Sequence, residues 1–377
     1  MPSEPLYFFE QTDFSLRLAH CSDAERPLRI DELKEVPLEA ADSLVGSVPA
    51  SAIVACAIRP KSRTLQLATS QEANQHPAIK GVQSFVAGSS SAKWFSAIQA
   101  RDGGDPTNLP WLVSTAAEDH PYSVGPLASL SLKPTRCVSA TITTAGALAR
   151  TCHTPTLLID IGEHSAHAIV ITRDGIVAAG VVSADMSRIG EAVQAELGLK
   201  FRGSALKLFF NPEYDFSDYA AKIASRLAPV IKTEVAALLK GAPAPTAMFV
   251  AGLPSQIEWF GAQLAAALEL SPFSPDFRAW STLTGITFSA RATLSPAFLA
   301  VVDFLYASTL SKSSHHAAWA AEWLSVETGA PATGRPASAP PASAMPLPTP
   351  VPLETIPPVP PAVAAAQSIP PTPVERS

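Results

Sequence analysis

Cysteine is scarce in this chain of 377 residues, which holds only four: Cys21, Cys56, Cys137 and Cys152. They lie far apart and form no C-x-x-C pair, which argues against a disulfide framework and against a zinc site. This spacing suits a reducing compartment, in which we expect the thiols to be buried as small apolar side chains.

Basic clusters and long apolar runs are also missing. No group of lysines and arginines is interleaved with aromatic residues, and the net charge is −6 with a pI near 5.8, so nucleic acid is not an expected partner. The longest apolar run, residues 298–310, is interrupted by Asp303 and is too short to span a membrane. The opening MPSEPLYFFEQTDF carries early acids and does not resemble a signal peptide. The sequence therefore predicts a soluble, cytoplasmic protein.

The motifs of several enzyme classes are absent as well. The sequence has no G-x-S-x-G elbow and no Walker-type glycine loop, so a serine hydrolase or a P-loop enzyme has no support. His164 and His167 are close in sequence, but their places along a strand point them to opposite faces. We therefore expect packed or solvated histidines there rather than a metal site.

The last residues, 329–377, are a mixture of proline, alanine and serine without an aromatic residue or a regular apolar period. Proline removes backbone donors and fixes φ near the polyproline value, so this segment cannot build a packed core. We predict a disordered tail, and either an inert tether or a docking peptide is consistent with its composition.

The stretch 157–182, LLIDIGEHSAHAIVITRDGIVAAGVV, has the pattern of three consecutive strands. Its first turn places Asp160 at the end of a strand, followed by Gly162 and then Ser165. A phosphate-binding loop needs a glycine that lets phosphate oxygens approach the backbone, a hydroxyl donor, and a carboxylate that holds hydrated Mg²⁺. Taken alone, the motif favours a plain hairpin, because D-x-G turns join strands in many proteins that bind nothing.

A similar strand, acidic turn and strand opens the chain, at residues 6–9, 10–13 and 14–20. The two occurrences lie about 150 residues apart, which predicts two related lobes. Between them, residues 52–58 and 64–68 have the pattern of a hairpin around a proline and basic turn.

Helical patterns dominate the second half, at residues 186–197, 217–239 and 256–268. A buried strand at 246–250 and the turn Ala251-Gly252-Leu253-Pro254-Ser255 precede the last of these helices. A strand that ends in a glycine turn and opens a helix collects free N–H groups at one point, which is one way to hold a nucleotide.

The order of these elements resembles the actin-like ATPase fold, and several segments resemble the PilM-type type IV pilus assembly proteins, relatives of the FtsA-type cell-division proteins. The stretch 157–182 resembles the family's second phosphate loop. WLVSTAAEDHPYSVGPLASLSLKPTRCVSATITTAGALAR resembles its strand, helix, "G-L-K-P" turn, strand and connecting helix. AELGLKFRGSALKLFF resembles its helical pair, TAMFVAGLPSQIEWFGAQLAAAL its adenosine-motif strand and helix, and ATLSPAFLAVVDFLYA its closing helix. Together these segments span about residues 5–310.

The resemblance implies an α/β chain with the two-lobed actin-like ATPase (ribonuclease H-like) fold and an inserted small subdomain. The first lobe is expected at residues 1–152, with the insertion at roughly 50–130, and the second at 153–310. A helical extension is expected at 311–328, before the tail at 329–377. Trp319 and Trp323 would share one face of a helix at 315–326, which packs on the second lobe or binds a partner.

The resemblance also implies a site for ATP with Mg²⁺. Its nucleotide-binding candidates are Glu10 in the first loop, Asp160, Gly162 and Ser165 in the second, Lys207 on the ribose side, and Gly252 and Ser255 in the adenosine turn. Asp160 is the candidate Mg²⁺ ligand.

The departures from the family pattern bear on activity. The first turn, Glu10-Gln11-Thr12-Asp13, lacks the family's glycine, and Asp13 would place a negative charge beside the phosphates. The adenosine turn keeps only Gly252, and Pro254 has no N–H to donate. Ser204 stands where the family has a glutamate. With one intact phosphate loop of two, hydrolysis is not expected, and nucleotide binding is an open question.

The first hypothesis is therefore a pseudo-ATPase scaffold peripheral to the inner membrane. It would recruit the cytoplasmic peptide of an inner-membrane pilus or secretion protein, alone or as a homo-oligomer. The alternative is an active ATPase or small-molecule kinase of the same fold, with Asp160 on Mg²⁺ and Ser165 on phosphate. A third hypothesis, the cytoplasmic domain of a type II secretion platform protein, has less support because a proline-rich tail stands where a membrane span would follow.

Overall fold

The structure is a computed structural model that describes residues 6–22, 27–59, 61, 63–68, 94–99, 111–116, 127, 136–309 and 324–327. All of these belong to one compact unit, residues 1–330. The proline-rich tail, residues 329–377, lies outside the described residues, so its disorder stays a prediction.

The first five-stranded sheet is built from the N-terminal part of the chain, in the order β4-β2-β1-β5-β9. β1 and β2 form the predicted opening hairpin, β4 pairs antiparallel with β2, and β5 and β9 run parallel to β1. The strands are β1 (Leu6–Gln11), β2 (Ser15–Cys21), β4 (Glu32–Pro37), β5 (Ile53–Ile58) and β9 (Arg136–Ser139).

Side chains alternate between the two faces of this sheet, and both faces are apolar. One face, which includes Phe9, packs with α1 (Ala41–Val45). The other, which includes Phe8, packs with α4 (Ala140–Thr151) and α10 (Leu299–Thr309). α10 lies within residues 153–310, and it contacts α4 and β1, with its side chains at 299–305 buried.

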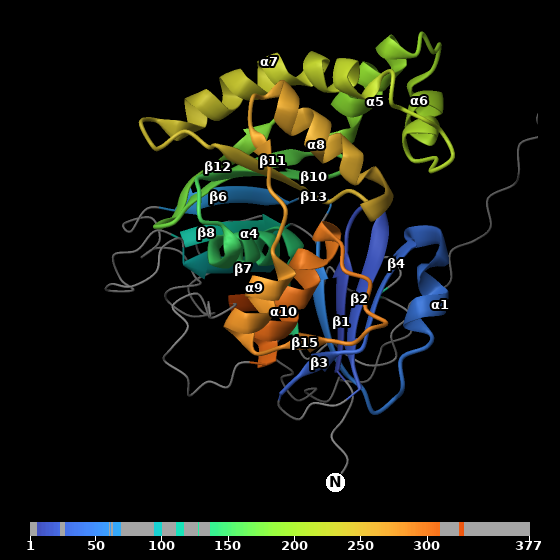
Figure 1. Ribbon diagram of the computed structural model, residues 1–377, viewed down its shortest axis with the longest axis vertical. Helices are drawn as coiled ribbons and strands as arrows, with labels where there is room; N and C mark the ends of the chain where they lie inside the picture. The colour runs from blue at the N-terminus through green and yellow to red at the C-terminus, as the bar shows by residue number, and fades with distance from the viewer. Residues whose placement is uncertain are drawn as a thin grey trace, which may run out of the picture. The chain divides into compact units, whose positions relative to one another are not determined.

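The second five-stranded sheet has the order β12-β11-β10-β13-β14. On one face it carries four helices, of which α7 and α8 lie along the sheet, and on the other face it contacts α4 (Figure 1). The strands are β10 (Thr156–Ile161), β11 (Ala166–Thr172), β12 (Gly175–Val182), β13 (Ala247–Ala251) and β14 (Ser271–Pro272), and the helices are α5 (Met186–Glu196), α6 (Arg202–Phe209), α7 (Ala220–Leu239) and α8 (Glu258–Ala267).

Local capping explains where two of the helices begin and where one of them ends. The carboxylate of Asp185 accepts hydrogen bonds from the N–H groups of Ser187 and Arg188 and starts α5. Asp276 does the same for α9 (Phe277–Thr284), which ends at Gly285 in the left-handed region, with φ of 71°.

The two large sheets repeat one topology. In each, the order in which the strands occur along the chain gives the spatial order 3-2-1-4-5, with three antiparallel strands followed by two parallel ones. The first turns also match, because the N–H of Thr12 donates to the carbonyl of Ser15 at 2.9 Å, and that of Gly162 donates to Ser165 at 3.0 Å. The protein therefore has the two-lobed α/β actin-like fold that the sequence predicted.

A third sheet has four strands in the order β16-β7-β8-β6. They are β6 (Thr64–Ala68), β7 (Trp94–Gln99), β8 (Trp111–Ala116) and β16 (Leu324–Glu327). The predicted hairpin of residues 52–58 and 64–68 is wrong, because β5 has β1 and β9 as neighbours on its two sides, and β6 pairs with β8 instead.

The predicted helical extension also differs from the structure at its end. Leu324–Glu327 is a strand that pairs antiparallel with β7, whose free edge supplies backbone hydrogen-bond partners. Residues 311–323, including Trp319 and Trp323, lie outside the described residues. The domain boundaries stay a prediction.

Within the part of the chain that the structure describes, no helix combines the length and the apolar character needed to cross a membrane. Cys21, Cys56 and Cys152 are buried free thiols, as the sequence predicted. Burial raises the pKa of Cys21 to about 12, so this thiol stays protonated and unreactive near neutral pH.

Candidate functional site

Two carboxylates from equivalent places in the two lobes share one arginine. Glu10 lies on β1 and Asp160 on β10, and Arg59 follows directly after β5. The Nη1 atom of Arg59 is 2.9 Å from Oε1 of Glu10, and its Nε atom is 2.8 Å from Oδ1 of Asp160. All three side chains have 0% exposure, so these ion pairs lie in a region from which water is excluded.

The remaining oxygens of these two carboxylates also have partners. The hydroxyl of Thr141, at the start of α4, donates to Oδ2 of Asp160 at 2.5 Å, and Arg63 Nη2 is 3.5 Å from the same oxygen. Oε2 of Glu10 is 3.2 Å from Nη1 of Arg17. Burial acts to raise the pKa of Asp160, but the charges of Arg59 and Arg63 outweigh it and leave this pKa below its ordinary value. Asp160 is therefore ionised at neutral pH.

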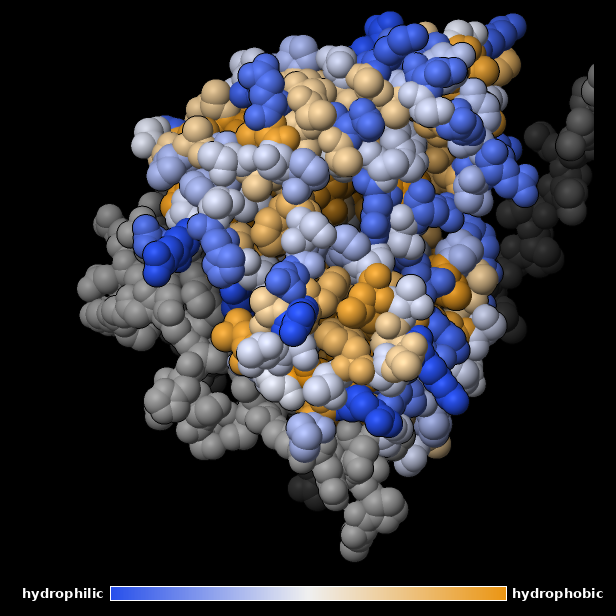
Figure 2. All heavy atoms as spheres, viewed as in Figure 1, coloured by the Kyte–Doolittle hydropathy of each residue, from blue (hydrophilic) through white to orange (hydrophobic). Residues whose placement is uncertain are grey.

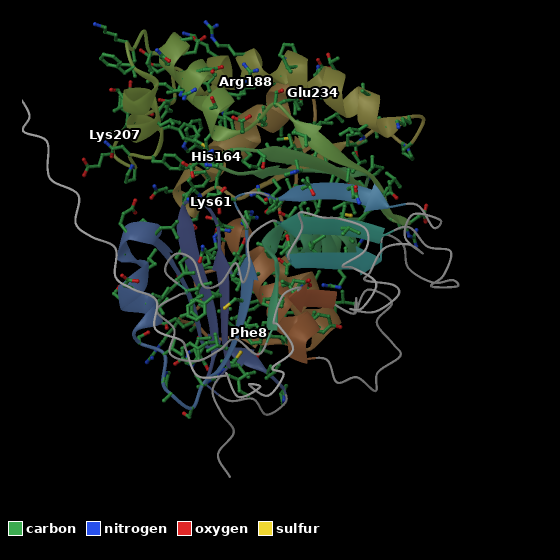
Figure 3. The ribbon with its side chains drawn as sticks, turned by 180° about the vertical axis from the view of Figure 1, so that it is seen from behind. Phe8, Lys61, His164, Arg188, Lys207 and Glu234 are labelled. Atoms are coloured by element: carbon green, nitrogen blue, oxygen red, sulfur yellow. The ribbon has the colours of Figure 1, made fainter. Side chains whose placement is uncertain are left out.

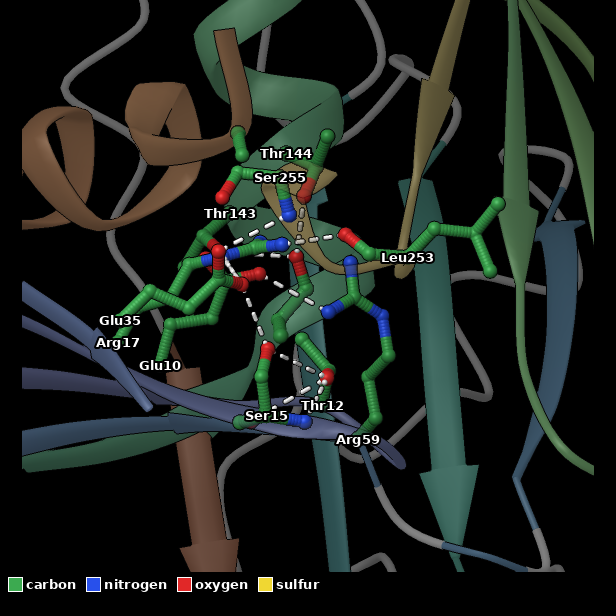
Figure 4. A network of polar contacts seen from close by, with 12 residues as sticks. Glu10, Thr12, Ser15, Arg17, Glu35, Arg59, Thr143, Thr144, Leu253 and Ser255 are labelled. Carbon is green, nitrogen blue, oxygen red and sulfur yellow. Dashed lines mark hydrogen bonds and ion pairs between the residues drawn. The ribbon is translucent and has the colours of Figure 1, made fainter. Parts of the chain in front are cut away.

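Arg17 and Glu35 fasten the turn after β13 to the first lobe (Figure 4). Arg17 donates from Nε to Oε1 of Glu35 at 2.8 Å and from Nη2 to the carbonyl of Leu253 at 2.5 Å. The other oxygen of Glu35 accepts from the N–H of Ser255 at 2.9 Å. The predicted adenosine turn thus makes its polar contacts with protein groups.

The two hairpin turns touch each other directly. Oδ2 of Asp13, in the first turn, accepts a hydrogen bond from the N–H of Glu163, in the second, at 2.7 Å. A Cβ atom on Gly162 would lie 2.5 Å from Nη2 of Arg63 and 2.7 Å from Oδ2 of Asp13. Asp13, Arg63 and the carbonyl oxygen of Ser165, at 2.9 Å from the same Cβ position, therefore occupy the space beside Gly162 into which the sequence analysis placed phosphate oxygens. The carboxylate of Asp13 takes a backbone N–H that a phosphate oxygen would use.

The structure brings some of the predicted site residues together. Glu10 and Asp160 meet through Arg59. Gly162 and Ser165 share the second turn, and the hydroxyl oxygen of Ser165 is buried without a hydrogen-bond partner among the described residues.

Gly252 adopts a φ of 95° and lies so close to β10 that a Cβ atom would be 2.0 Å from the carbonyl oxygen of Ile161. It lines a cavity of about 200 Å³ together with Glu10, Arg17 and apolar residues of β13 and α8. Figure 2 shows a hollow with an apolar floor in this part of the molecule.

Lys207 lies apart from this cluster, on the exposed surface of α6 at the outer side of the second lobe (Figure 3). With Ser255, it lines a larger cavity of about 800 Å³ whose other wall includes Glu35 and Glu39 of the first lobe. The predicted ribose-side residue therefore faces open space, whereas the predicted phosphate-side residues face protein groups.

His164 and His167 diverge. The side chain of His164 is 62% exposed and lies near Glu163, whereas His167 on β11 is buried. Burial, together with the nearby charge of Arg63, lowers the pKa of His167 to about 4, against the opposing effect of Asp160. His167 is therefore neutral at pH 7.

The present arrangement does not suit Mg²⁺ at Asp160. Magnesium needs oxygen ligands in a near-octahedral shell and keeps several waters, but here the two carboxylate oxygens are held by Arg59 and Thr141. Within the described residues, no cluster of three or more His, Cys, Asp or Glu side chains could hold a metal ion. Binding of Mg²⁺ would have to displace a buried guanidinium, and the role of Asp160 as a metal ligand stays a prediction.

The sequence analysis missed the cationic half of this cluster: Arg17, Arg59 and Arg63. Arg17 lies on β2, and it is 2% exposed. Arg59 and Arg63 lie where the sequence analysis predicted only a proline and basic turn, and they are 2% and 6% exposed. The available signal was the position of Arg59, which directly follows a wholly apolar strand.

Comparison with known proteins identifies the fold. No protein-family model and no curated protein matches the sequence. Among solved structures, a chain of the "PilM-PilN type IV pilus biogenesis complex" aligns with a TM-score of 0.53 and 15% identity, over 81% of this chain and 98% of that one. This protein thus has a PilM-like, actin-like fold.

Weaker likenesses have TM-scores below 0.5. The archaeal actin homologue Ta0583 reaches 0.38 at 9% identity, over 82% of this chain and 99% of that one. The cytoplasmic domain of EpsL, "an inner membrane component of the type II secretion system of Vibrio cholerae", reaches 0.33 at 11% identity, over 80% and 95% of the two chains. At these scores, neither likeness supports an inference about this chain.

Proposed function

We propose that this protein is a cytoplasmic scaffold of a type IV pilus or a related secretion assembly, peripheral to the inner membrane, in which the actin-like fold acts as a pseudo-ATPase. One observation carries the proposal: Asp13, Arg59 and Arg63 stand between the two hairpin turns, where nucleotide phosphates and their cation would lie. Protein groups would thus make the contacts that a nucleotide makes in an active member of the fold.

The energetics favour a cleft that stays closed. Binding phosphate at the second turn would require removal of Asp13 from the N–H of Glu163 and of Arg63 from the space above Gly162. Freeing Asp160 would leave Arg59 with Glu10 alone, and breaking a buried ion pair typically costs about 3–5 kcal/mol. An ATP complex would have to offset these losses before it gained any affinity.

The partner in this proposal is a cytoplasmic segment of an inner-membrane protein. The likeness to a chain of the PilM-PilN complex motivates it, because that chain was solved together with a partner in an assembly for type IV pilus biogenesis. A scaffold with a fixed arrangement of lobes can present a preformed surface to such a segment, without the ordering cost that a mobile site carries.

ATP binding is the second candidate, and the cavity of about 800 Å³ favours it. Its volume falls within the range of small-molecule sites, and it retains Lys207 and Ser255, two of the predicted nucleotide-binding residues.

Calorimetric titration of the full chain with Mg²⁺ and ATP separates the two candidates. We expect no binding heat at millimolar ATP, with the protein shown to be folded by circular dichroism. Micromolar binding that is lost in Asp160→Asn would contradict the proposal and would assign the site to the active alternative. Lys207→Gln changes a residue that lines the cavity of about 800 Å³. If the protein is a pseudo-ATPase, this variant also gives no binding heat with ATP.

The partner is tested by coexpression of the full chain with the cytoplasmic segments of short inner-membrane proteins encoded beside its gene. We expect one of them to copurify in a defined stoichiometry, with or without ATP. If none of these segments binds, the proposed recruitment of a membrane partner is contradicted, even if the protein also fails to bind nucleotide.

A further inference from the structure

A third cavity lies within the second lobe, away from the ion pairs between the lobes. It has a volume of about 540 Å³ and is formed by the end of α6, the loop that follows, and residues at the start of α8. Its floor contains the buried rings of Phe209 and Phe216, and half-buried Tyr214 and Trp259 line its sides.

The aromatic lining is held in place by ring contacts. Phe216 stacks on Trp259 with a centroid distance of 5.1 Å and an interplanar angle of 19°, and Tyr214 meets Phe216 edge-on at 4.7 Å. Phe209 contacts both Phe216 and Trp259. Because each ring is fixed by another, the cavity is preformed and needs little ordering when a ligand enters.

The rim of the cavity is negative. Exposed Glu213 and Asp215 line it, and none of the lining residues in the described chain is Lys, Arg or His. Among the described residues, Glu213 has no ion-pair partner, and the side chain of Asp215 accepts only from Ser217. Aromatic faces below and carboxylates above both attract a cation, through the ring quadrupole and through direct charge.

The aromatic cavity is continuous with the cavity of about 800 Å³ described above. Phe210, Pro212 and Gln256 line both this cavity and the one of about 800 Å³ that reaches Lys207 and Glu39. At the junction, the side chain of Gln256 donates to the carbonyl of Phe210 at 3.0 Å. A furrow of this extent fits an extended peptide better than a small free cation, which would fill only its aromatic end.

We propose that this furrow, defined as the two cavities joined at Phe210, binds a basic segment of a partner polypeptide. An arginine or lysine side chain of the segment enters the aromatic cavity lined by Tyr214 and Trp259, and its charge is met by Glu213. The inference deepens the proposed function by naming the chemistry of the partner segment, and it rests on that function only for the existence of a partner. The aromatic cavity belongs to the second lobe alone, whereas the part of the furrow that reaches Lys207 also has a wall in the first lobe.

Fluorescence anisotropy of the full chain tests the site with a labelled peptide of alternating arginine and alanine as the probe. The same peptide with citrulline in place of arginine keeps the shape and the hydrogen bonds but removes the charge. Glu213→Gln is compared with Glu269→Gln, a side chain that is 82% exposed in the same lobe and gives the same change in net charge. Trp259→Leu removes the aromatic wall, and its fold is checked by thermal unfolding.

We expect the arginine peptide to bind and the citrulline peptide to bind at least tenfold more weakly. Glu213→Gln should weaken binding about fivefold and Trp259→Leu about tenfold, whereas Glu269→Gln should change it less than twofold. Equal weakening by Glu213→Gln and Glu269→Gln would show general charge attraction and overturn the site, as would absence of binding or equal binding of the citrulline peptide.

The assay is run with and without Mg²⁺ and ATP, so that the two proposals fail separately. Nucleotide binding by calorimetry with unchanged peptide affinity would reject the pseudo-ATPase and keep the furrow. If neither the peptide nor the nucleotide binds, the furrow is rejected and the pseudo-ATPase proposal stands.

Discussion

At the scale of single residues, the guanidinium of Arg59 holds together two carboxylates that come from opposite lobes. Burial acts to lower its pKa, but Asp160 and Glu10 outweigh that effect and raise it, so the cation is permanent. Its planar fork reaches Asp160 through Nε and Glu10 through Nη1, which the single point charge of a lysine could not do. The loss of Arg59 would leave two buried anions next to each other.

We therefore expect Arg59→Met to lower the free energy of unfolding by about 3–5 kcal/mol, as measured by urea denaturation. The control is Arg188→Met, because Arg188 pairs with Glu191 at the surface, where the two side chains are 58% and 50% exposed, and such a pair contributes less than about 1 kcal/mol. Adding Glu10→Gln and Asp160→Asn to Arg59→Met should recover part of the loss. Equal stability of the Arg59 and Arg188 variants would mean that the cluster adds nothing to folding.

At the scale of elements, the turn between β13 and α8 shows how closely the second lobe is packed. Its Gly252 has a φ of 95°, and Gly241, which follows α7, has a nearly equal φ of 92°. A Cβ atom at Gly241 would meet nothing within 4 Å, whereas at Gly252 it would meet the backbone of Ile161. The pair separates the cost of a left-handed backbone from the cost of a steric clash.

Gly241→Ala should lower the free energy of unfolding by about 1 kcal/mol, which is the cost of a positive φ for a residue with a side chain. Gly252→Ala should cost at least about 2 kcal/mol more, because β10 and the turn must move apart. Thermal unfolding of both variants measures the difference. Similar melting temperatures would show that the turn can shift at no cost.

At the scale of the whole molecule, the acid response of the protein reports on groups buried between its sheets. His167 has a pKa lowered to about 4, chiefly by burial. It is held neutral in the folded state, so its contribution to stability is complete above the unfolded pKa of about 6.5 and is lost as the pH falls below it. The lowered pKa of Asp160 acts in the same direction, but only below about pH 4.

We expect the free energy of unfolding to fall from pH 6.5 towards pH 4, with His167 contributing up to about 1.4 kcal/mol per pH unit. His167→Asn removes this titration and should flatten the curve by about one proton, as measured by urea denaturation at each pH. His164→Asn makes the same substitution in the same hairpin at an exposed position and serves as its control. A slope that His167→Asn does not alter would show that His167 is not held neutral in the folded protein.

The two hairpins and the helices of the second lobe could be predicted because their signals are local. Apolar runs and, in β2, alternation predicted the strands β1, β2 and β10 to β12, and the glycine turn after β13 predicted the helix that follows it. The pairing partners of β5 and β6 could not be predicted from local signals. Nothing in residues 52–68 shows that one strand lies between β1 and β9 while the next joins another sheet.

The sequence by itself determined the repeated strand, turn and strand units, the missing glycine of the first turn, and the one glycine kept in each of the other two turns. These depend on neighbouring residues and on backbone conformations that only certain side chains allow. Only the tertiary structure decided what fills the space between the turns. Arg59 and Asp160 are 101 positions apart, and Asp13 and Glu163 are 150 apart. Partners at such separations are chosen by packing of the two sheets around α4, because a buried charge must pair with whatever opposite charge the fold places within reach.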